Sequence, residues 1–188
     1  MSADRGTVLL RLARHAIERA LGLDAAVKED AAWLAEPGAT FVTLRQGGNL
    51  RGCIGSLEAR RPLIQDVMFN AMASALRDPR FPPLTADELP RTCVEVSLLS
   101  PLEPIAFGDG EDALRQLHPG VDGVVLEYQG HRGTFLPQVW SDLPDRRSFL
   151  RHLKRKAGLA EDFWSPELRL YRYRVEKWKE PDREKVTT

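Results

Sequence analysis

Three observations predict an α+β fold for this sequence. Helix-like and strand-like segments interleave irregularly, without the repeating strand–helix–strand order of a parallel sheet. Two pairs of strand-like runs are joined by short turns, at Gly47-Gly48 and Gln129-Gly130, as expected for β-hairpins. The 188 residues, of which 43% are hydrophobic, suffice for the core of one compact domain that includes a smaller lobe.

Four segments have the periodicity of helices, namely residues 6–21, 62–77, 109–118 and 145–157. Gly22 and Gly158 follow the first and the last of them as stop signals. The second is expected to end at Asp78-Pro79, because the residue before a proline is disfavoured in the helical conformation. Thr85 and Glu88 have the spacing of a capping box, which predicts a short helical turn in the following connection.

Four further segments are strand-like, namely the hairpins 41–57 and 120–137 and the single strands 92–105 and 169–178. Alternation in 92–105 places Cys93, Glu95 and Ser97 on one side of the strand. A two-residue turn at Gly47-Gly48 fixes the register of the first hairpin. It places Arg45 opposite Leu50, Leu44 opposite Arg51, Thr43 opposite Gly52 and Val42 opposite Cys53.

The composition argues against several classes of protein. Lys+Arg 27 balances Asp+Glu 27, whereas a nucleic-acid-binding protein usually has a basic excess that neutralises phosphates. The two cysteines, Cys53 and Cys93, lack the spacing of a metal site, and no metal is expected. No apolar run reaches the length of about 18 residues that spans a membrane, and the charged N-terminal region lacks the pattern of a signal peptide. We therefore expect a cytoplasmic protein with reduced thiols.

Six motifs occur in order between residues 50 and 159, namely "LRGCIGSLE", "RDPRFPPLTADELP", "EVSLLSPLEPI", "GVDGVVLE", "RGTFLPQVW" and "FLRHLKRKAGL". Through them the whole chain resembles the AMMECR domain family, known in bacteria and archaea as AmmeMemoRadiSam system protein A. The signature Arg51-Gly52-Cys53-Ile54-Gly55 is intact, while Ser56 stands where relatives often have threonine.

The resemblance implies a two-lobed α+β fold with a mixed sheet flanked by helices. A single domain would span residues 1–180, with the smaller lobe within about 105–160 and a flexible tail at 181–188. The resemblance also implies association with a Memo-like protein and a radical-SAM protein as partners. It implies no particular reaction, substrate or cofactor, and the oligomeric state stays open.

Cys53 is the foremost candidate for chemistry, as a nucleophile or redox thiol. In the predicted register Arg51 and Cys53 project from the same face, and Gly52 and Gly55 leave room for a ligand. The alternative is structural, since cysteine often packs as a small hydrophobic residue. Glu95 is the candidate base or arginine partner, or else an exposed strand residue.

A second candidate site comprises donors and an aromatic ring in "GHRGTFLPQVW", namely Arg132, Thr134, Gln138 and Trp140. Arg132 could hold an anionic group through two hydrogen bonds, whereas His131 is expected at a solvated turn. The helix 145–157 carries a basic face that either contacts phosphate or an acidic partner, or is simply solvated. That face consists of Arg147, Arg151, Lys154 and Arg155.

Three hypotheses follow for the function. The first is a small-ligand or partner-binding component of a modification pathway, in which Cys53 carries an activity with Arg51 and Glu95 in support. The second is a non-catalytic scaffold, favoured by the lack of an activating histidine near Cys53. The third is an RNA-binding or RNA-modification accessory protein, which the zero net charge disfavours. Whether the protein is an enzyme is therefore left open.

Overall fold

The computed structural model describes residues 4–23 and 26–181, which form helices and two β-sheets and confirm the α+β class. The chain folds into two compact units. The first, here called the N-terminal unit, comprises the described residues up to Leu99 together with those from Glu176 on. The second, the central unit, is Ser100–Val175 and is wider than the predicted 105–160, because it needs the strand at Arg169–Tyr173.

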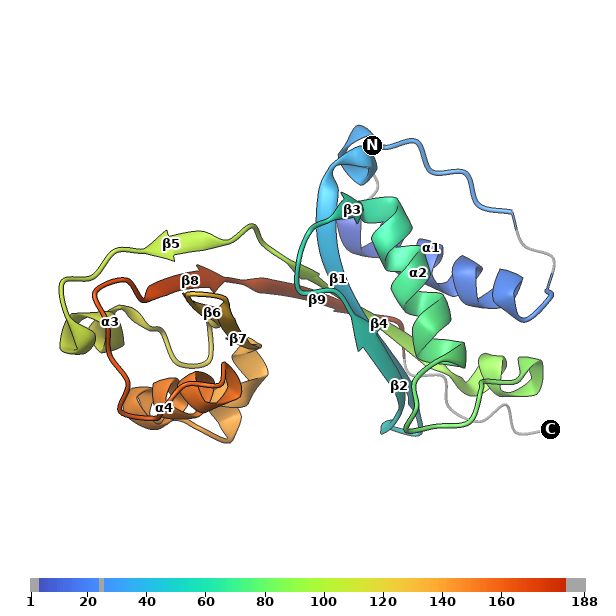
Figure 1. Cartoon of the computed structure of the whole chain (residues 1–188). Coiled ribbons are helices and arrows are strands. Elements are labelled where there is room, and N and C mark those ends of the chain that lie inside the picture. Colours follow the sequence, from blue (N-terminus) through green and yellow to red (C-terminus); the bar gives the residue numbers. More distant parts are fainter. Residues whose placement is uncertain (1–3, 24–25, 182–188) are drawn as a thin grey trace. The chain divides into compact units, whose positions relative to one another are not determined.

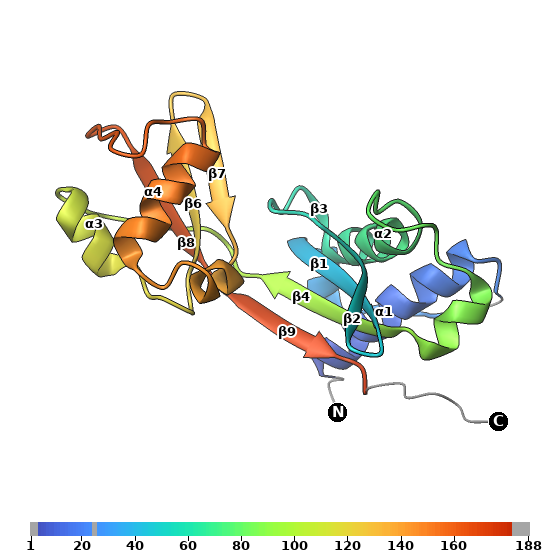
Figure 2. The same ribbon diagram turned by 90° about the horizontal axis from the view of Figure 1, so that it is seen from below.

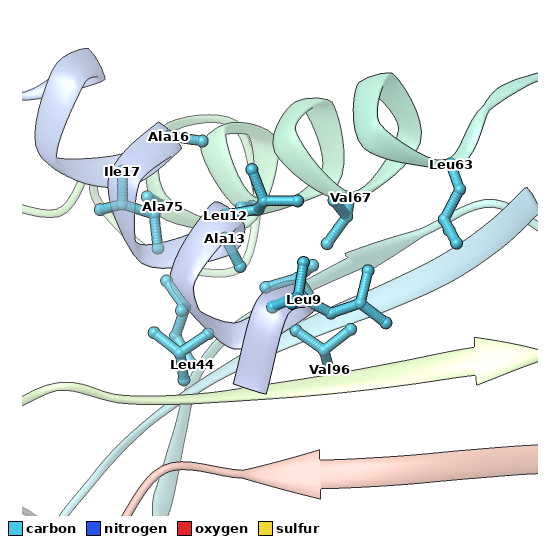
Figure 3. Close-up of a cluster of buried hydrophobic side chains, with 14 of the residues drawn as sticks. Leu9, Leu12, Ala13, Ala16, Ile17, Leu44, Leu63, Val67, Ala75 and Val96 are labelled. Atoms are coloured by element: carbon cyan, nitrogen blue, oxygen red, sulfur yellow. The ribbon is translucent and has the colours of Figure 1, made fainter. Parts of the chain in front are cut away.

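The N-terminal unit is built on a sheet with strand order β2-β1-β4-β9, to which the short β3 adds beside β1 (Figure 1). Helices α1 and α2 pack on one face of this sheet (Figure 3). The elements in chain order are α1 (Arg5–Ala20), the 3-10 helix η1 (Ala32–Ala35), β1 (Pro37–Gln46), β2 (Asn49–Gly55), β3 (Arg61–Pro62), α2 (Leu63–Leu76), the 3-10 helix η2 (Ala86–Arg91), β4 (Cys93–Leu99) and β9 (Val175–Lys179).

The core of the N-terminal unit lies between the two helices and the sheet. Leu9 and Leu12 of α1 meet Val67 of α2 above the strands, where Leu44 of β1 and Val96 of β4 point toward them (Figure 3). All five side chains are almost fully buried. Their burial, the main favourable contribution to folding, fixes which face of β1 and β4 is turned toward the helices.

The β1–β2 hairpin turns at Gly47-Gly48 as predicted, with positive φ angles of 54° and 81°. Arg45 lies opposite Leu50, but the register then shifts at a bulge. Beyond it, Leu44 lies opposite Gly52, Thr43 opposite Cys53 and Val42 opposite Ile54. The predicted register is therefore wrong by one residue from Leu44 on, because β2 accommodates one extra residue, Arg51, that a uniform ladder does not allow for.

The central unit contains a second sheet with strand order β5-β8-β6-β7. Three of its strands, β6, β7 and β8, are labelled in Figure 2. Its core includes Trp140 stacked on Phe149, with ring centroids 3.6 Å apart. The turn of the β6–β7 hairpin lies at Gln129-Gly130 as predicted. The elements are β5 (Glu103–Ile105), α3 (Gly110–Gln116), β6 (Gly123–Tyr128), β7 (His131–Phe135), the 3-10 helix η3 (Pro137–Ser141), α4 (Arg146–Lys156) and β8 (Arg169–Tyr173).

Two strands predicted as continuous are each divided between the sheets. The segment 92–105 becomes β4 and β5, and 169–178 becomes β8 and β9. The first break falls at Ser100-Pro101, where the proline has no N–H to continue a ladder. Ser100 and Arg174 bond to each other at the two breaks, through Ser100 N to Arg174 O at 2.8 Å and Arg174 N to Ser100 Oγ at 2.9 Å.

The direction of the strands and the predicted C-terminal tail remain to be described. All strand pairs with a described register are antiparallel, in place of the mixed sheet that the resemblance implies. From residue 182 on, the predicted tail lies outside the described residues. Among the residues with described positions, no helix is both long and apolar enough to cross a membrane.

Candidate functional site

The backbone of Cys53 is held from both sides by one ion pair. Its N–H donates to Asp78 Oδ2 at 2.8 Å, and its carbonyl accepts from Arg80 Nη2 at 3.2 Å. Asp78 and Arg80 are themselves joined, with Arg80 Nη2 2.7 Å from Asp78 Oδ2. The Arg80 hydrogen bonds hold the pKa of the buried Asp78 well below its usual range, so that its carboxylate is ionised whenever the protein is folded near neutral pH.

The clamp on Cys53 belongs to a longer polar stripe along α2. Asp66, Asn70 and Ser74 follow one another at intervals of four residues, and Asp78 continues this spacing just beyond the helix. Ser74 Oγ accepts from Ile54 N at 2.8 Å and lies 2.7 Å from both Val42 O and Asn70 O, either of which can accept its proton. Ser74 of α2 and Asp78 just beyond the helix thus accept from the N–H groups of Ile54 and Cys53 in β2.

The upper part of the same stripe fixes the beginning of the hairpin. Asp66 accepts from Thr40 N at 2.7 Å and from Ser56 Oγ at 2.7 Å, and Asn70 donates to Thr40 O at 3.0 Å. Asp66 and Asn70 are almost entirely buried. Because buried polar groups are costly unless they are hydrogen-bonded, this network specifies how α2 sits against β1 and β2.

The thiol of Cys53 lies on the sheet face opposite the two helices. Val42 and Leu44 face the helices, so alternation turns Thr43 away from them, and Cys53 is paired with Thr43. The half-buried Sγ lies 3.1 Å from Thr43 Oγ1. We call this side of the sheet the outer face, formed by Phe41, Thr43, Arg45, Cys53, Glu95 and Ser97.

Glu95 is in the same row as Cys53, with Thr43 between them. Burial raises its pKa, but Lys177 at 2.7 Å and Arg45 at 2.8 Å outweigh this effect and leave the pKa below its ordinary value. Two strand spacings, about 10 Å, separate the backbones of Glu95 and Cys53. The described contacts of the Glu95 carboxylate are with Lys177 and Arg45, and that of the thiol is with Thr43, so Glu95 is not hydrogen-bonded to the thiol as a base that takes its proton would be.

Arg51 contacts neither Glu95 nor the thiol in the described contacts. Its Nε and Nη2 donate to the two carboxylate oxygens of Glu88 at 3.1 and 3.0 Å, and its Nη1 donates to Pro82 O at 3.0 Å. These bonds from Arg51 lower the pKa of Glu88 to about 2, and bonds from Thr85 and Gln46 act in the same direction. Arg51 therefore ties β2 to η2, and each of its three nitrogens already donates within the protein.

The glycines of the signature accommodate the protein itself. A Cβ at Gly52 would lie 2.2 Å from Ser74 O, a backbone atom of α2. A Cβ at Gly55 would lie 2.2 Å from the ring of Phe41. The space beside these glycines is thus filled by the protein itself and is not left for a ligand, as the sequence suggested. Gly52 lets α2 approach, and Gly55 lies under an aromatic ring.

The second group of candidate residues lies in the central unit and does not form one cluster. Arg132 pairs with Glu127 at 3.0 Å, and the Thr134 hydroxyl lies 3.2 Å from the Tyr173 hydroxyl. Gln138 is exposed. Trp140 is 3% exposed and donates from Nε1 to Asp122 O at 2.7 Å, so it packs in the core and does not line a rim. Nearby His131 contacts Ala157 O through Nδ1 at 3.0 Å.

The basic face of α4 is largely neutralised by the protein's own carboxylates. Arg147 pairs with Glu111 at 2.7 Å, and Arg151 and Arg155 both pair with Glu161, at 2.6 and 3.1 Å. Lys154, expected on the same face, is buried. These pairs weaken the interpretation of the helix as a phosphate-binding surface, because they compete with any added anion.

Sequence reasoning missed Asp78, Ser74 and Thr43, which hold or contact Cys53. In the sequence analysis Arg80 is only one residue of the motif "RDPRFPPLTADELP" and is given no role. A signal was present, because polar residues recur every four positions in the otherwise apolar segment 62–77. Among the residues with described positions, no group of three or more His, Cys, Asp or Glu side chains could hold a metal ion.

Comparison with known proteins identifies the family of this chain. The AMMECR1 family model matches residues 10–178. The chain belongs to the AMMECR1 family. A protein of Methanothermobacter thermautotrophicus is 39% identical over 94% of both chains, and protein PH0010 of Pyrococcus horikoshii is 37% identical over 93% of this chain and 89% of its own. The crystal structure of PH0010, titled as an uncharacterized protein, has a TM-score of 0.75 and covers 93% of this AMMECR1-family chain and 91% of its own.

The close approach at Gly52 yields a stability prediction. Gly52→Ala should lower the free energy of unfolding by about 1–3 kcal/mol, because the new methyl group meets a backbone carbonyl that moves only with α2. Urea denaturation measures the change. Gly108→Ala is the control, since nothing lies within 4 Å of a Cβ there and its φ is ordinary. Equal effects of the two substitutions would contradict the described contact.

The Arg51–Glu88 pair yields a pH prediction. The folded pKa of Glu88, about 2, lies below its ordinary value of 4.5, so the pair stabilises the fold above pH 4.5. Its contribution should fade as the pH falls from 4.5 through about 2. The difference in unfolding free energy between wild type and Glu88→Gln, measured by denaturation at each pH, should shrink over this range. A difference that stays constant down to the lowest pH would contradict the assignment.

Proposed function

We propose that this AMMECR1-family protein is a binding component of a modification pathway and that the outer face around Cys53 is its recognition surface. The proposal rests chiefly on one observation. The Asp78–Arg80 pair fixes both backbone groups of Cys53, while the thiol is left half-buried on the sheet face that α1 and α2 do not cover. A rigid backbone beneath an accessible side chain is the arrangement that presents a surface group to a partner at little entropic cost.

The outer face offers several kinds of contact within a small area. The Phe41 ring lies across Gly55, the Thr43 hydroxyl and Cys53 thiol adjoin each other, and Arg45 is half-buried beside Glu95. An aromatic ring, an arginine and small polar groups are the residues that protein interfaces favour. This mixture suits a peptide or protein segment better than a compact charged ligand.

A Cys53-dependent activity is the second candidate, because the half-buried thiol is partly accessible to a reactant. Among the described residues, however, the hydrogen-bond partner of Sγ is a hydroxyl, and Glu95 lies two strands away. The geometry therefore supports binding more strongly than it supports nucleophilic catalysis, which normally pairs the thiol with a base.

The resemblance to AmmeMemoRadiSam system proteins suggests which partners to test first, namely the Memo-like and radical-SAM proteins of the same genome. RNA is a weaker candidate, because the arginines on the basic face of α4 are paired with carboxylates. An RNA-dependent mode would show an affinity that falls steeply with salt concentration. The affinity of a partner bound through the outer face should depend less on salt concentration.

The two cysteines should differ sharply in reactivity. Cys53 should be alkylated by N-ethylmaleimide in the folded protein, because its side chain is partly accessible. Cys93 should react only in denaturant, because it is 4% exposed and its Sγ donates to Glu180 O at 3.2 Å. Peptide mapping by mass spectrometry locates the adduct. Modification of Cys93 before Cys53 would overturn this account of the outer face.

The binding proposal is tested with the same adduct. The wild-type chain, blocked at Cys53 with a bulky maleimide, is titrated against each purified partner by calorimetry, and Cys53→Ser treated with the same reagent serves as the control. We expect blocking to abolish binding and Cys53→Ser to preserve it. Unchanged binding by the blocked chain would refute the outer face as the recognition surface. Loss of binding in Cys53→Ser, with its fold intact, would instead favour the thiol-dependent activity.

A further inference from the structure

The central unit contains a pocket between α3 and α4 that is lined by a largely buried lysine, Lys154. Its volume is about 490 Å³, and the segment that follows α4 completes it with Asp162 and Trp164. Lys154 is 7% exposed, and its Nζ lies 5.6 Å from the centroid of the Trp164 ring. Within the described part of the chain, this amine has no hydrogen-bond or ion-pair partner.

Two of the three carboxylates that line the pocket are paired with arginines. Glu111 binds both Nη atoms of Arg147, at 2.7 and 2.9 Å, and Glu161 binds Arg151. The third, Asp162, acts on Lys154 only through its longer-range field and is itself exposed. The ammonium group of Lys154 is therefore left without a contacting counter-ion in the described part of the chain.

A buried charge without a contacting partner is costly for the protein. Burial lowers the pKa of Lys154 below its ordinary value of 10.5, although the field of Asp162 acts against the shift. The hydration that the largely buried cation loses is offset by the weak attraction of the Trp164 ring and by the field of Asp162, and by no direct hydrogen bond among the described residues. An anion that enters the pocket would provide the missing partner and a charge-assisted hydrogen bond.

The position of Trp164 indicates that the anionic ligand also has an aromatic or other flat ring. Trp164 is 37% exposed and lines the pocket, and the Phe107 ring packs against its ring with centroids 5.6 Å apart. The indole is thus supported by Phe107 and presents apolar surface near the amine of Lys154. Aromatic rings of a ligand favour offset or edge contacts with such a surface.

We propose that this pocket binds a small anionic molecule with a flat ring, whose carboxylate or phosphate group contacts Lys154 while its ring lies against Trp164. The site is independent of the outer face around Cys53, since every residue that lines it belongs to the central unit.

The test is calorimetric titration of the full chain with benzoate, phenyl phosphate and inorganic phosphate. We expect benzoate or phenyl phosphate to bind at one site per chain, and the tighter of the two shows whether carboxylate or phosphate is preferred. Lys154→Met should weaken that binding at least tenfold. Lys156→Met should not, because Lys156 lies on the same helix but outside the pocket and donates to Thr134 O.

Two further measurements keep the result interpretable. Circular dichroism and thermal unfolding establish that Lys154→Met is folded, as expected when a buried charge is replaced by an apolar side chain of similar length. Trp164→Leu should weaken phenyl phosphate more than inorganic phosphate, because only the former uses the ring. Equal weakening would overturn the assignment of the ring to Trp164.

The pH dependence provides an independent check. The carboxylate of benzoate stays ionised at neutral and alkaline pH, so the affinity for benzoate follows the protonation of Lys154. The other charged residues that face this amine in the pocket are Asp162, Glu111, Glu161, Arg147 and Arg151. The affinity should fall as the pH rises toward 10.5 and should be pH-independent in Lys154→Met. The proposal fails if neither ring-bearing probe binds below about 10 mM, or if Lys154→Met binds as tightly as the wild type.

Discussion

The attachment of β2 to α2 by side-chain hydrogen bonds is the interaction on which the candidate site depends. β2 lies at the end of its sheet and pairs with β1 on one edge only. Its other edge is satisfied by Ser74 and Asp78, which accept from the N–H groups of Ile54 and Cys53. This arrangement protects an edge strand that would otherwise present unpaired donors, and it fixes the position of Cys53 relative to the core.

The same attachment explains the amino acids of the signature. Gly52 is needed where the strand touches the backbone of α2, and Arg51 occupies the bulge and ties it to Glu88. Cys53 is the residue of this stretch whose side chain adjoins Thr43 on the other face of the sheet. Packing and hydrogen bonding therefore explain the amino acids at most positions of the signature. They do not explain why residue 53 carries a thiol.

Much of the fold could be predicted because it follows from local patterns. Hydrophobic periodicity located α1, α2 and α4, and the glycine turns located both hairpins. The bulge at Arg51 was not predictable, since it depends on contacts with Glu88 and Pro82, more than thirty residues away. The breaks that separate β4 from β5 and β8 from β9 were also missed, because both halves have the same alternation and differ only in the sheet that they join.

The candidate site was predictable only in part, because its chemistry depends on tertiary partners. Cys53 could be named from its setting among glycines, and Glu95 from its position in an apolar strand. That Glu95 pairs with Arg45 and Lys177, and Arg51 with Glu88, depends on strand order and register. Trp140 resembles a binding residue in sequence, but its stacking on Phe149 places it in a core.

The candidate site depends on the hydrogen bond by which Asp78 holds the backbone of Cys53. Native-state hydrogen exchange of the Cys53 amide, measured by NMR in wild type and in Asp78→Ala, tests this contact. We predict that the amide is protected in the wild type and exchanges roughly tenfold faster or more in the variant, while amides within α1 and in the control Asp87→Ala change little. An unchanged exchange rate at Cys53 in Asp78→Ala would contradict this contact.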